Sequence, residues 1–90
     1  LQRYADALTH FQAAVKYQKE YLPDSHPTFA SLYNNIGSMF YRQEMFDEAL
    51  PFYLKSLEIE LMVLPANHPT IAVTHFNIAT TYTGLGRFDE

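Results

Sequence analysis

The chain contains the stretch Leu22-Pro23-Asp24-Ser25-His26-Pro27-Thr28, and Leu64-Pro65-Ala66-Asn67-His68-Pro69-Thr70 follows it 42 residues later. The same spacing matches Ala7-Leu8 with Ala49-Leu50, Asn35-Ile36 with Asn77-Ile78, and Phe46-Asp47-Glu48 with Phe88-Asp89-Glu90. Of the 48 residue pairs that can be compared at this spacing, 13 are identical. Random pairing would give about three identities. The chain is therefore an internal repeat, which predicts that one structural unit occurs in tandem.

Each copy of the repeat contains two segments whose apolar residues have helical spacing. Tyr4, Ala7, Leu8 and Phe11 follow it, as do Phe46, Ala49, Leu50 and Tyr53. Pro27 and Pro69 suit the first position of a helix. We expect helices over 3–22, 27–42, 46–64 and 69–83, no strands, and a further helix that begins at Phe88. Short connections make neighbouring helices antiparallel, so the prediction is an all-α fold, an α-solenoid of helix pairs.

Composition narrows the possible functions. Ninety residues allow one domain, and 48% hydrophobic residues exclude intrinsic disorder. A net charge of −4 with six scattered cations leaves no basic surface for nucleic acid. No apolar run reaches the roughly 20 residues of a membrane span. The absence of cysteine excludes a disulfide framework and a thiolate metal site and fits a reducing, cytoplasmic compartment. Because the chain begins in mid-repeat, we interpret it as part of a longer array.

The residue types of catalytic sites have structural explanations here. His26 and His68 recur with the repeat, at points too far apart to share one metal ion, so we expect them to cap helices. His75 stands where the repeat has a large ring and is expected to pack in the core. Glu58 and Glu60 are expected on the solvated face of a long helix. We predict no enzyme activity, no metal site and no cofactor.

The residues of one repeat resemble the tetratricopeptide signature. That pattern reads Tyr33-x2-Ile36-Gly37-x2-Phe40 followed by Ala49-x3-Tyr53, and the second copy has His75-x2-Ile78-Ala79-x2-Tyr82. The 42-residue period and the His-Pro helix starts are similar to those of kinesin light chains and related proteins. The resemblance implies a fragment of a right-handed superhelix in which 3–22 is the second helix of a repeat, 27–64 a full repeat, and 69–83 the first helix of the next repeat. It also implies a scaffold that binds a partner protein in a concave groove.

In such a groove the first helix of each repeat carries the binding residues. The candidates are Ser31, Asn34, Asn35, Ser38, Tyr41, Arg42, Val73, Phe76, Asn77 and Thr80. Asn35 and Asn77 are equivalent, and a primary amide can donate to and accept from a peptide backbone. The alternative is that these asparagines cap or bridge adjacent helices. The family's clamp for C-terminal carboxylates needs lysines where this chain has Ser31 and Val73.

Two functions remain open at the level of the sequence. The first is a scaffold whose groove binds an extended peptide of a partner protein, without a nucleic-acid or membrane partner. The second is a structural spacer or self-association array with no peptide ligand of its own. Because the first and last helices would each lack one neighbour, we expect end-to-end self-association of this chain. Gly37 is expected where two helices cross closely.

Overall fold

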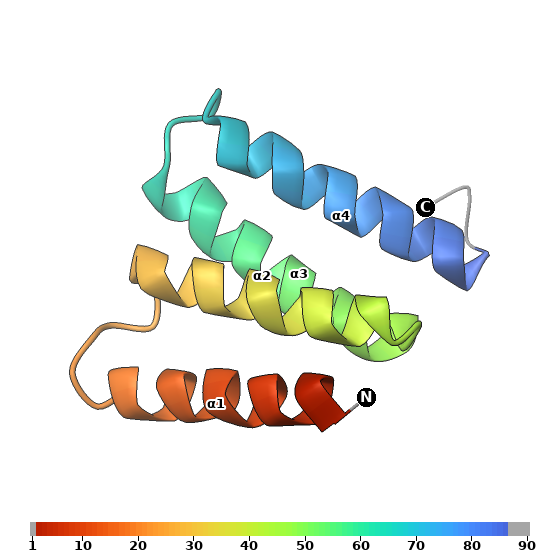
Figure 1. The fold of residues 1–90 in the computed structure, drawn as a ribbon. Helices are drawn as coiled ribbons and strands as arrows, with labels where there is room; N and C mark the ends of the chain where they lie inside the picture. The colour runs from red at the N-terminus through yellow and green to blue at the C-terminus, as the bar shows by residue number, and fades with distance from the viewer. Residues whose placement is uncertain (1, 87–90) are drawn as a thin grey trace.

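The computed structural model describes residues 2–86, which form four helices (Figure 1). They are α1 (Gln2–Gln18), α2 (Pro27–Arg42), α3 (Phe46–Val63) and α4 (Pro69–Leu85). No strand occurs among these residues, and successive helices run antiparallel. The predicted all-α solenoid is therefore confirmed. The helix expected to begin at Phe88 lies outside the described residues.

The helix ends differ from the sequence expectation at α1 and α4. α1 ends at Gln18 rather than at 22, and the chain continues in turns in which the Tyr21 N–H donates to the Gln18 carbonyl over 3.0 Å. Leu22 precedes a proline, and a residue in that position avoids the helical conformation, so the expected last turn does not form. α4 continues to Leu85 rather than 83, because Gly86 closes the helix with a left-handed φ of 76°.

α2 and α4 begin in the same way. The His26 Nδ1 accepts a hydrogen bond from the Thr28 N–H over 3.2 Å, and the His68 Nδ1 accepts one from the Thr70 N–H over 3.1 Å. Each imidazole thus satisfies one of the backbone donors that a helix start leaves unpaired. The expectation that these histidines cap helices is confirmed.

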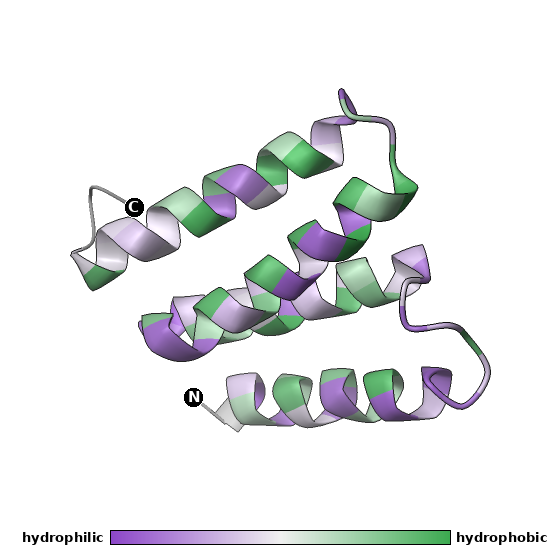
Figure 2. Cartoon of the chain, turned by 180° about the vertical axis from the view of Figure 1, so that it is seen from behind, coloured by the Kyte–Doolittle hydropathy of each residue, from purple (hydrophilic) through white to green (hydrophobic). Residues whose placement is uncertain are grey.

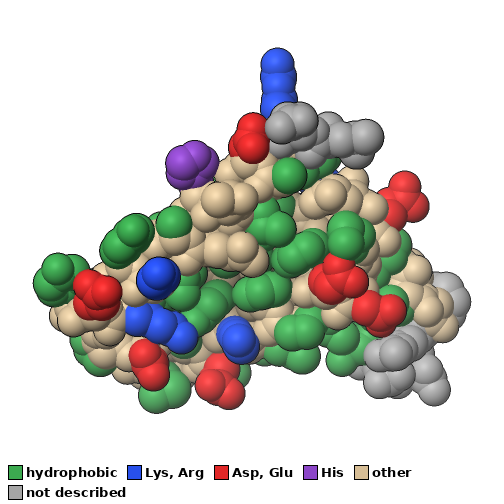
Figure 3. All heavy atoms as spheres, turned by 90° about the horizontal axis from the view of Figure 1, so that it is seen from below, with side chains coloured by type: hydrophobic (Ala, Val, Ile, Leu, Met, Phe, Trp, Pro, Cys, Tyr) green, Lys and Arg blue, Asp and Glu red, His purple; other side chains and the backbone are tan. Residues whose placement is uncertain are grey.

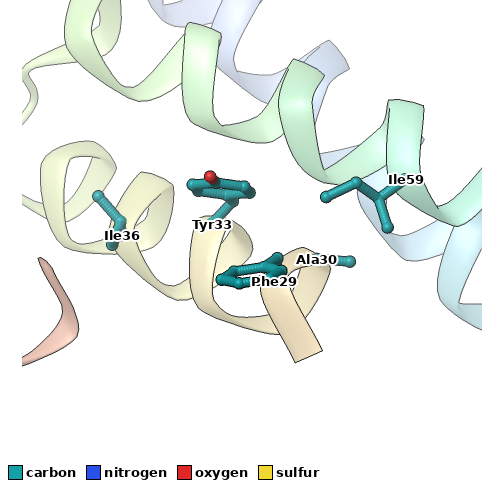
Figure 4. Close-up of a cluster of buried hydrophobic side chains, with 5 residues drawn as sticks. All are labelled: Phe29, Ala30, Tyr33, Ile36 and Ile59. Carbon is teal, nitrogen blue, oxygen red and sulfur yellow. The ribbon is translucent and has the colours of Figure 1, made fainter. Parts of the chain in front are cut away.

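The main hydrophobic core lies around α2. Figure 4 shows its buried side chains, which are Phe29, Ala30, Tyr33 and Ile36 of α2 and Ile59 of α3. The rings of Phe29 and Tyr33 stack with their centroids 6.3 Å apart. α1 contributes half-buried side chains to the same core, namely Leu8, Phe11 and Val15. A second cluster joins α3 to α4 through Ala49, Tyr53 and Ile78.

The closest approach of α2 and α3 is at Gly37. A Cβ atom at this position would lie 2.9 Å from the Tyr53 ring, which is closer than side chains normally approach. The expected close crossing at Gly37 is therefore present. The equivalent residue of α4 is Ala79, which is exposed.

The four helices form a flat layer that measures 39 × 37 × 16 Å. α1 and α4 lie at its opposite edges, and α2 and α3 lie between them (Figure 1). Hydrophobic residues also occupy the C-terminal end of α3, next to the loop that leads to α4 (Figure 2). Among the described helices, none is long and apolar enough to cross a membrane.

Candidate functional site

A chain of side-chain hydrogen bonds holds α4 beside α2. The Asn34 Nδ2 of α2 donates to the Thr74 Oγ1 of α4 over 3.1 Å, and the Asn77 Nδ2 donates back to the Asn34 Oδ1 over 3.2 Å. Both ends of the Asn34 amide are thus used. Because a donor and an acceptor on one planar group must both be satisfied, these contacts restrict how α4 can rotate against α2.

The ten residues predicted from the sequence divide into two groups by burial. The exposed group is Ser31, Asn35, Arg42, Val73 and Phe76. The half-buried group is Asn34, Ser38, Tyr41, Asn77 and Thr80. Val73 is 54% exposed and Phe76 is 67% exposed. On the faces that carry Asn34 and Asn77, a ligand can therefore reach polar side chains on α2 and apolar side chains on α4.

The two equivalent asparagines have different surroundings. Asn77 bridges α4 to α2 through its hydrogen bond to Asn34. Asn35 is exposed, and its side chain makes no hydrogen bond to any residue between 2 and 86. Of the two roles that the sequence left open, the structure shows the bridging role for Asn77. The Asn35 amide keeps both its donors and its acceptor available.

The half-buried hydroxyl groups of the candidate set also contact the protein. The Ser38 Oγ and the Tyr53 hydroxyl are hydrogen-bonded over 3.0 Å. Burial raises the pKa of the Tyr53 hydroxyl above its ordinary value of 10.0, although the hydrogen bond with Ser38 acts in the opposite direction. The Tyr41 ring meets the Phe46 ring edge-on, with centroids 5.3 Å apart. The Thr80 Oγ1 donates to a backbone carbonyl of its own helix. These side chains link α2 to α3 or stabilise α4.

Glu60 is buried, which corrects the expectation of a solvated carboxylate. It is 2% exposed, and its Oε2 accepts a hydrogen bond from the Thr74 Oγ1 over 3.0 Å. The Ser56 Oγ lies 3.2 Å from the same oxygen and 2.8 Å from the Ala30 carbonyl. The Glu60 Oε1 is buried with no hydrogen-bond partner in the described part of the chain. The other member of the expected pair, Glu58, is exposed as predicted.

The burial of Glu60 has a signal in the sequence. Ala49, Tyr53, Ser56 and Glu60 follow one another at steps of four, three and four residues, which places them on one face of a helix. The first three belong to the packed face, so the fourth does as well. The charge of Glu60 concealed this periodicity, because carboxylates are rarely buried.

His75 is exposed, which corrects its expected place in the core. Its counterpart in the preceding repeat, Tyr33, is 9% exposed because α3 covers it. No helix covers the same face of α4 within residues 2–86. In that range no group of three or more His, Cys, Asp or Glu side chains could hold a metal ion.

A protein-family comparison agrees with this architecture. The family model described as tetratricopeptide repeat matches residues 1–59 and, in a second overlapping match, residues 28–90. No individual curated protein matches the chain. Tetratricopeptide repeats are non-catalytic helical scaffolds that generally mediate interactions between proteins. The paired antiparallel helices, the close crossing at Gly37 and the two family matches together show that this chain belongs to the tetratricopeptide repeat family.

Proposed function

We propose that this chain binds an extended peptide of a partner protein on the face formed by α2 and α4. The observation that carries the proposal is the exposure of Asn35, Arg42 and Val73 on two helices that Asn34 and Asn77 hold side by side. Side chains that are not needed for packing stand on both sides of a rigid junction. Such a surface can hold a ligand in one orientation at little cost in protein entropy.

The exposed groups indicate the chemistry of the peptide. The Asn35 amide can pair with a peptide backbone, which makes that contact independent of the ligand sequence. Val73 and Phe76 offer apolar surface for one hydrophobic side chain of the ligand. Arg42 is the cation among the ten candidate residues, so the ligand needs few acidic groups and its affinity should depend only weakly on salt.

The finer family assignment is part of the proposal. The 42-residue period and the repeated His-Pro helix starts support an array of the kinesin-light-chain-like type. Long repeats of that type fit a scaffold that recruits a partner in the cytoplasm. The alternative is a spacer or self-association array. It is favoured by the bridging role of Asn77, which uses a candidate binding residue for packing.

A peptide library tests the groove. The wild-type chain should enrich peptides with a common apolar anchor, and Asn35→Ala and Val73→Ser should each weaken their binding by about tenfold, the effect of losing one hydrogen bond or apolar contact. Asn67→Ala is the matched control, because Asn67 is equally exposed but lies in the loop before α4. No enrichment, or equal recovery by Asn35→Ala and wild type, would favour the spacer.

A further inference from the structure

α1 and α4 each leave open the kind of face that α2 and α3 bury against each other. Shifting the chain by 42 residues makes α1 the counterpart of α3 and α4 the counterpart of α2. Ile59 of α3 is 6% exposed, whereas its counterpart Tyr17 of α1 is 60% exposed. Tyr33 of α2 is buried, whereas its counterpart His75 of α4 is exposed. One chain therefore carries both halves of a helix pair, unpartnered, at opposite edges (Figure 1).

Two hollows show how the open face of α4 differs from the closed face of α2. The first has a volume of about 200 Å³ and is lined by Lys19, Asp24 and Tyr33 and, from α3, by Lys55, Glu58 and Ile59. The second has a volume of about 370 Å³, and its lining includes Leu61, Ala66 and His75. These three are the 42-residue counterparts of Lys19, Asp24 and Tyr33. The second hollow is thus the first without the helix that closes it.

We propose that α1 of a second copy of this chain closes the face of α4, in the register in which α3 packs on α2. In that register Tyr17 of the second copy takes the place of Ile59 and enters the hollow beside Leu61 and His75. The chemistry of the two sides agrees. The first hollow is rimmed by Lys19 and Asp24, and the second has Leu61, which is 58% exposed, and Ala66 at the same points. An apolar rim suits a tyrosine ring.

A second pair of positions changes in the same way. Within one chain, Asn34 of α2 donates to Thr74 of α4, and both side chains are polar. Between copies the equivalent positions are Phe76 of one chain and Leu32 of the next, and both are apolar. Phe76 is 67% exposed in the single chain, so the contact would remove it from water. Two correlated changes of polarity indicate that a copy of this chain suits the open face.

The remaining contacts can form without unpaired polar groups. Phe11 of the second copy would replace Tyr53, and Thr80 would replace Ser38. The hydrogen bond of Ser38 with the Tyr53 hydroxyl is then absent, but the Thr80 Oγ1 already donates to a carbonyl of its own helix over 2.9 Å. Ala79 stands in place of Gly37, so α1 must dock slightly farther away than α3 does. The contact is consequently weaker than the one between α2 and α3.

The contact joins two different surfaces, so it leaves one open face on each end of the assembly. Successive copies would add in the same direction and extend the solenoid as an open chain. Figure 3 looks at the molecule from the side on which α1 lies, and hydrophobic side chains are spread across that face. These side chains are what the contact would bury.

Sedimentation velocity on the 90-residue chain tests the proposal. We expect the 10.4 kDa monomer to give way to dimers and longer species as concentration rises toward about 1 mM, where even weak contacts are populated. Tyr17→Asp and Leu61→Lys should each raise the dissociation constant at least tenfold. Tyr21→Asp and Met62→Lys are matched controls, since Tyr21 and Met62 are 82% and 67% exposed and lie outside the contact. Circular dichroism checks that each variant is folded.

Cysteine pairing tests the register with milder changes. The Ser56 Oγ lies 2.8 Å from the Ala30 carbonyl, and the counterparts of these residues are Ala14 and Ala72. The chain has no cysteine of its own, so a mixture of Ala14→Cys and Ala72→Cys chains should form mixed disulfide dimers. A mixture of Ala5→Cys and Ala72→Cys should not. A monomer at every concentration, or an assembly that Tyr17→Asp and Leu61→Lys leave intact, would overturn the proposal. Neither result depends on Asn35 or on a peptide ligand.

Discussion

The two sides of α2 show how one backbone arrangement can be held by different chemistry. On one side α2 packs against α1, and on the other its repeat-equivalent junction is that of α4 with α3. The junction of α1 with α2 places Gln18 and Leu32 where the junction of α3 with α4 has Glu60 and Thr74. The first is mainly apolar and includes Leu32 in the core, whereas the second contains hydrogen bonds to a buried carboxylate.

The difference concerns specificity more than adhesion. Apolar contacts are non-directional, so the α1 junction tolerates small shifts of one helix along the other. A buried carboxylate is costly unless its hydrogen bonds form, and those of Glu60 to Thr74 form in one register only. Gln18 has a buried Oε1 without a partner in the described residues, at the position equivalent to Glu60. Both junctions thus keep a polar group at this point, but only the second satisfies part of it.

The largest expected effect distinguishes the covered helix from the open one. Gly37→Leu should lower the free energy of unfolding by about 3 kcal/mol, because its side chain would collide with the Tyr53 ring. Ala79→Leu, the same change at the exposed equivalent position, should change it by less than about 0.5 kcal/mol. Urea denaturation of dilute samples measures both. Equal losses would mean that α4 is as covered as α2.

A smaller effect should separate the polar junction from the apolar one. Thr74→Val keeps the shape of the side chain but removes the donor to Glu60 and the acceptor for Asn34, at a cost of about 2 kcal/mol. Thr83→Val is the control, since Thr83 is exposed on the same helix and bonds only to its own backbone. Thermal unfolding compares the two. A loss for Thr74→Val no larger than for Thr83→Val would show that the polar junction contributes nothing.

The smallest effect concerns the ends of the two equivalent helices. Glu44 has a φ of 60°, and its counterpart Gly86 has a φ of 76°. The left-handed conformation costs a non-glycine residue roughly 1–2 kcal/mol, and glycine adds somewhat less than 1 kcal/mol of unfolded-state entropy. Glu44→Gly should therefore raise stability by about 0.5–1 kcal/mol, seen as a higher Tm. Gln43→Gly, next to it at a φ of −90°, should lower the Tm instead; a gain there would point to another cause.

The candidate site was only partly predictable. The exposure of Asn35, Arg42 and Val73 agrees with their place off the packed helical face. The separation of Asn35 from Asn77 could not be predicted, because it depends on which helix lies beside each of them. Asn34 occupies Asn77, and no described helix stands in the same relation to Asn35. The repeat makes the two residues equivalent in sequence, but their positions in the layer make them different.

What the sequence determined by itself is local. The helix starts at His26 and His68 follow from side chains that pair with backbone groups two residues away, and the 42-residue period sets the order of the helices. Only the tertiary structure decided that Glu60 is buried and that His75 is exposed. The physical reason is that burial is a property of a neighbourhood. Glu60 lies where α3 meets both α2 and α4, whereas His75 lies on a face of α4 that no described helix covers.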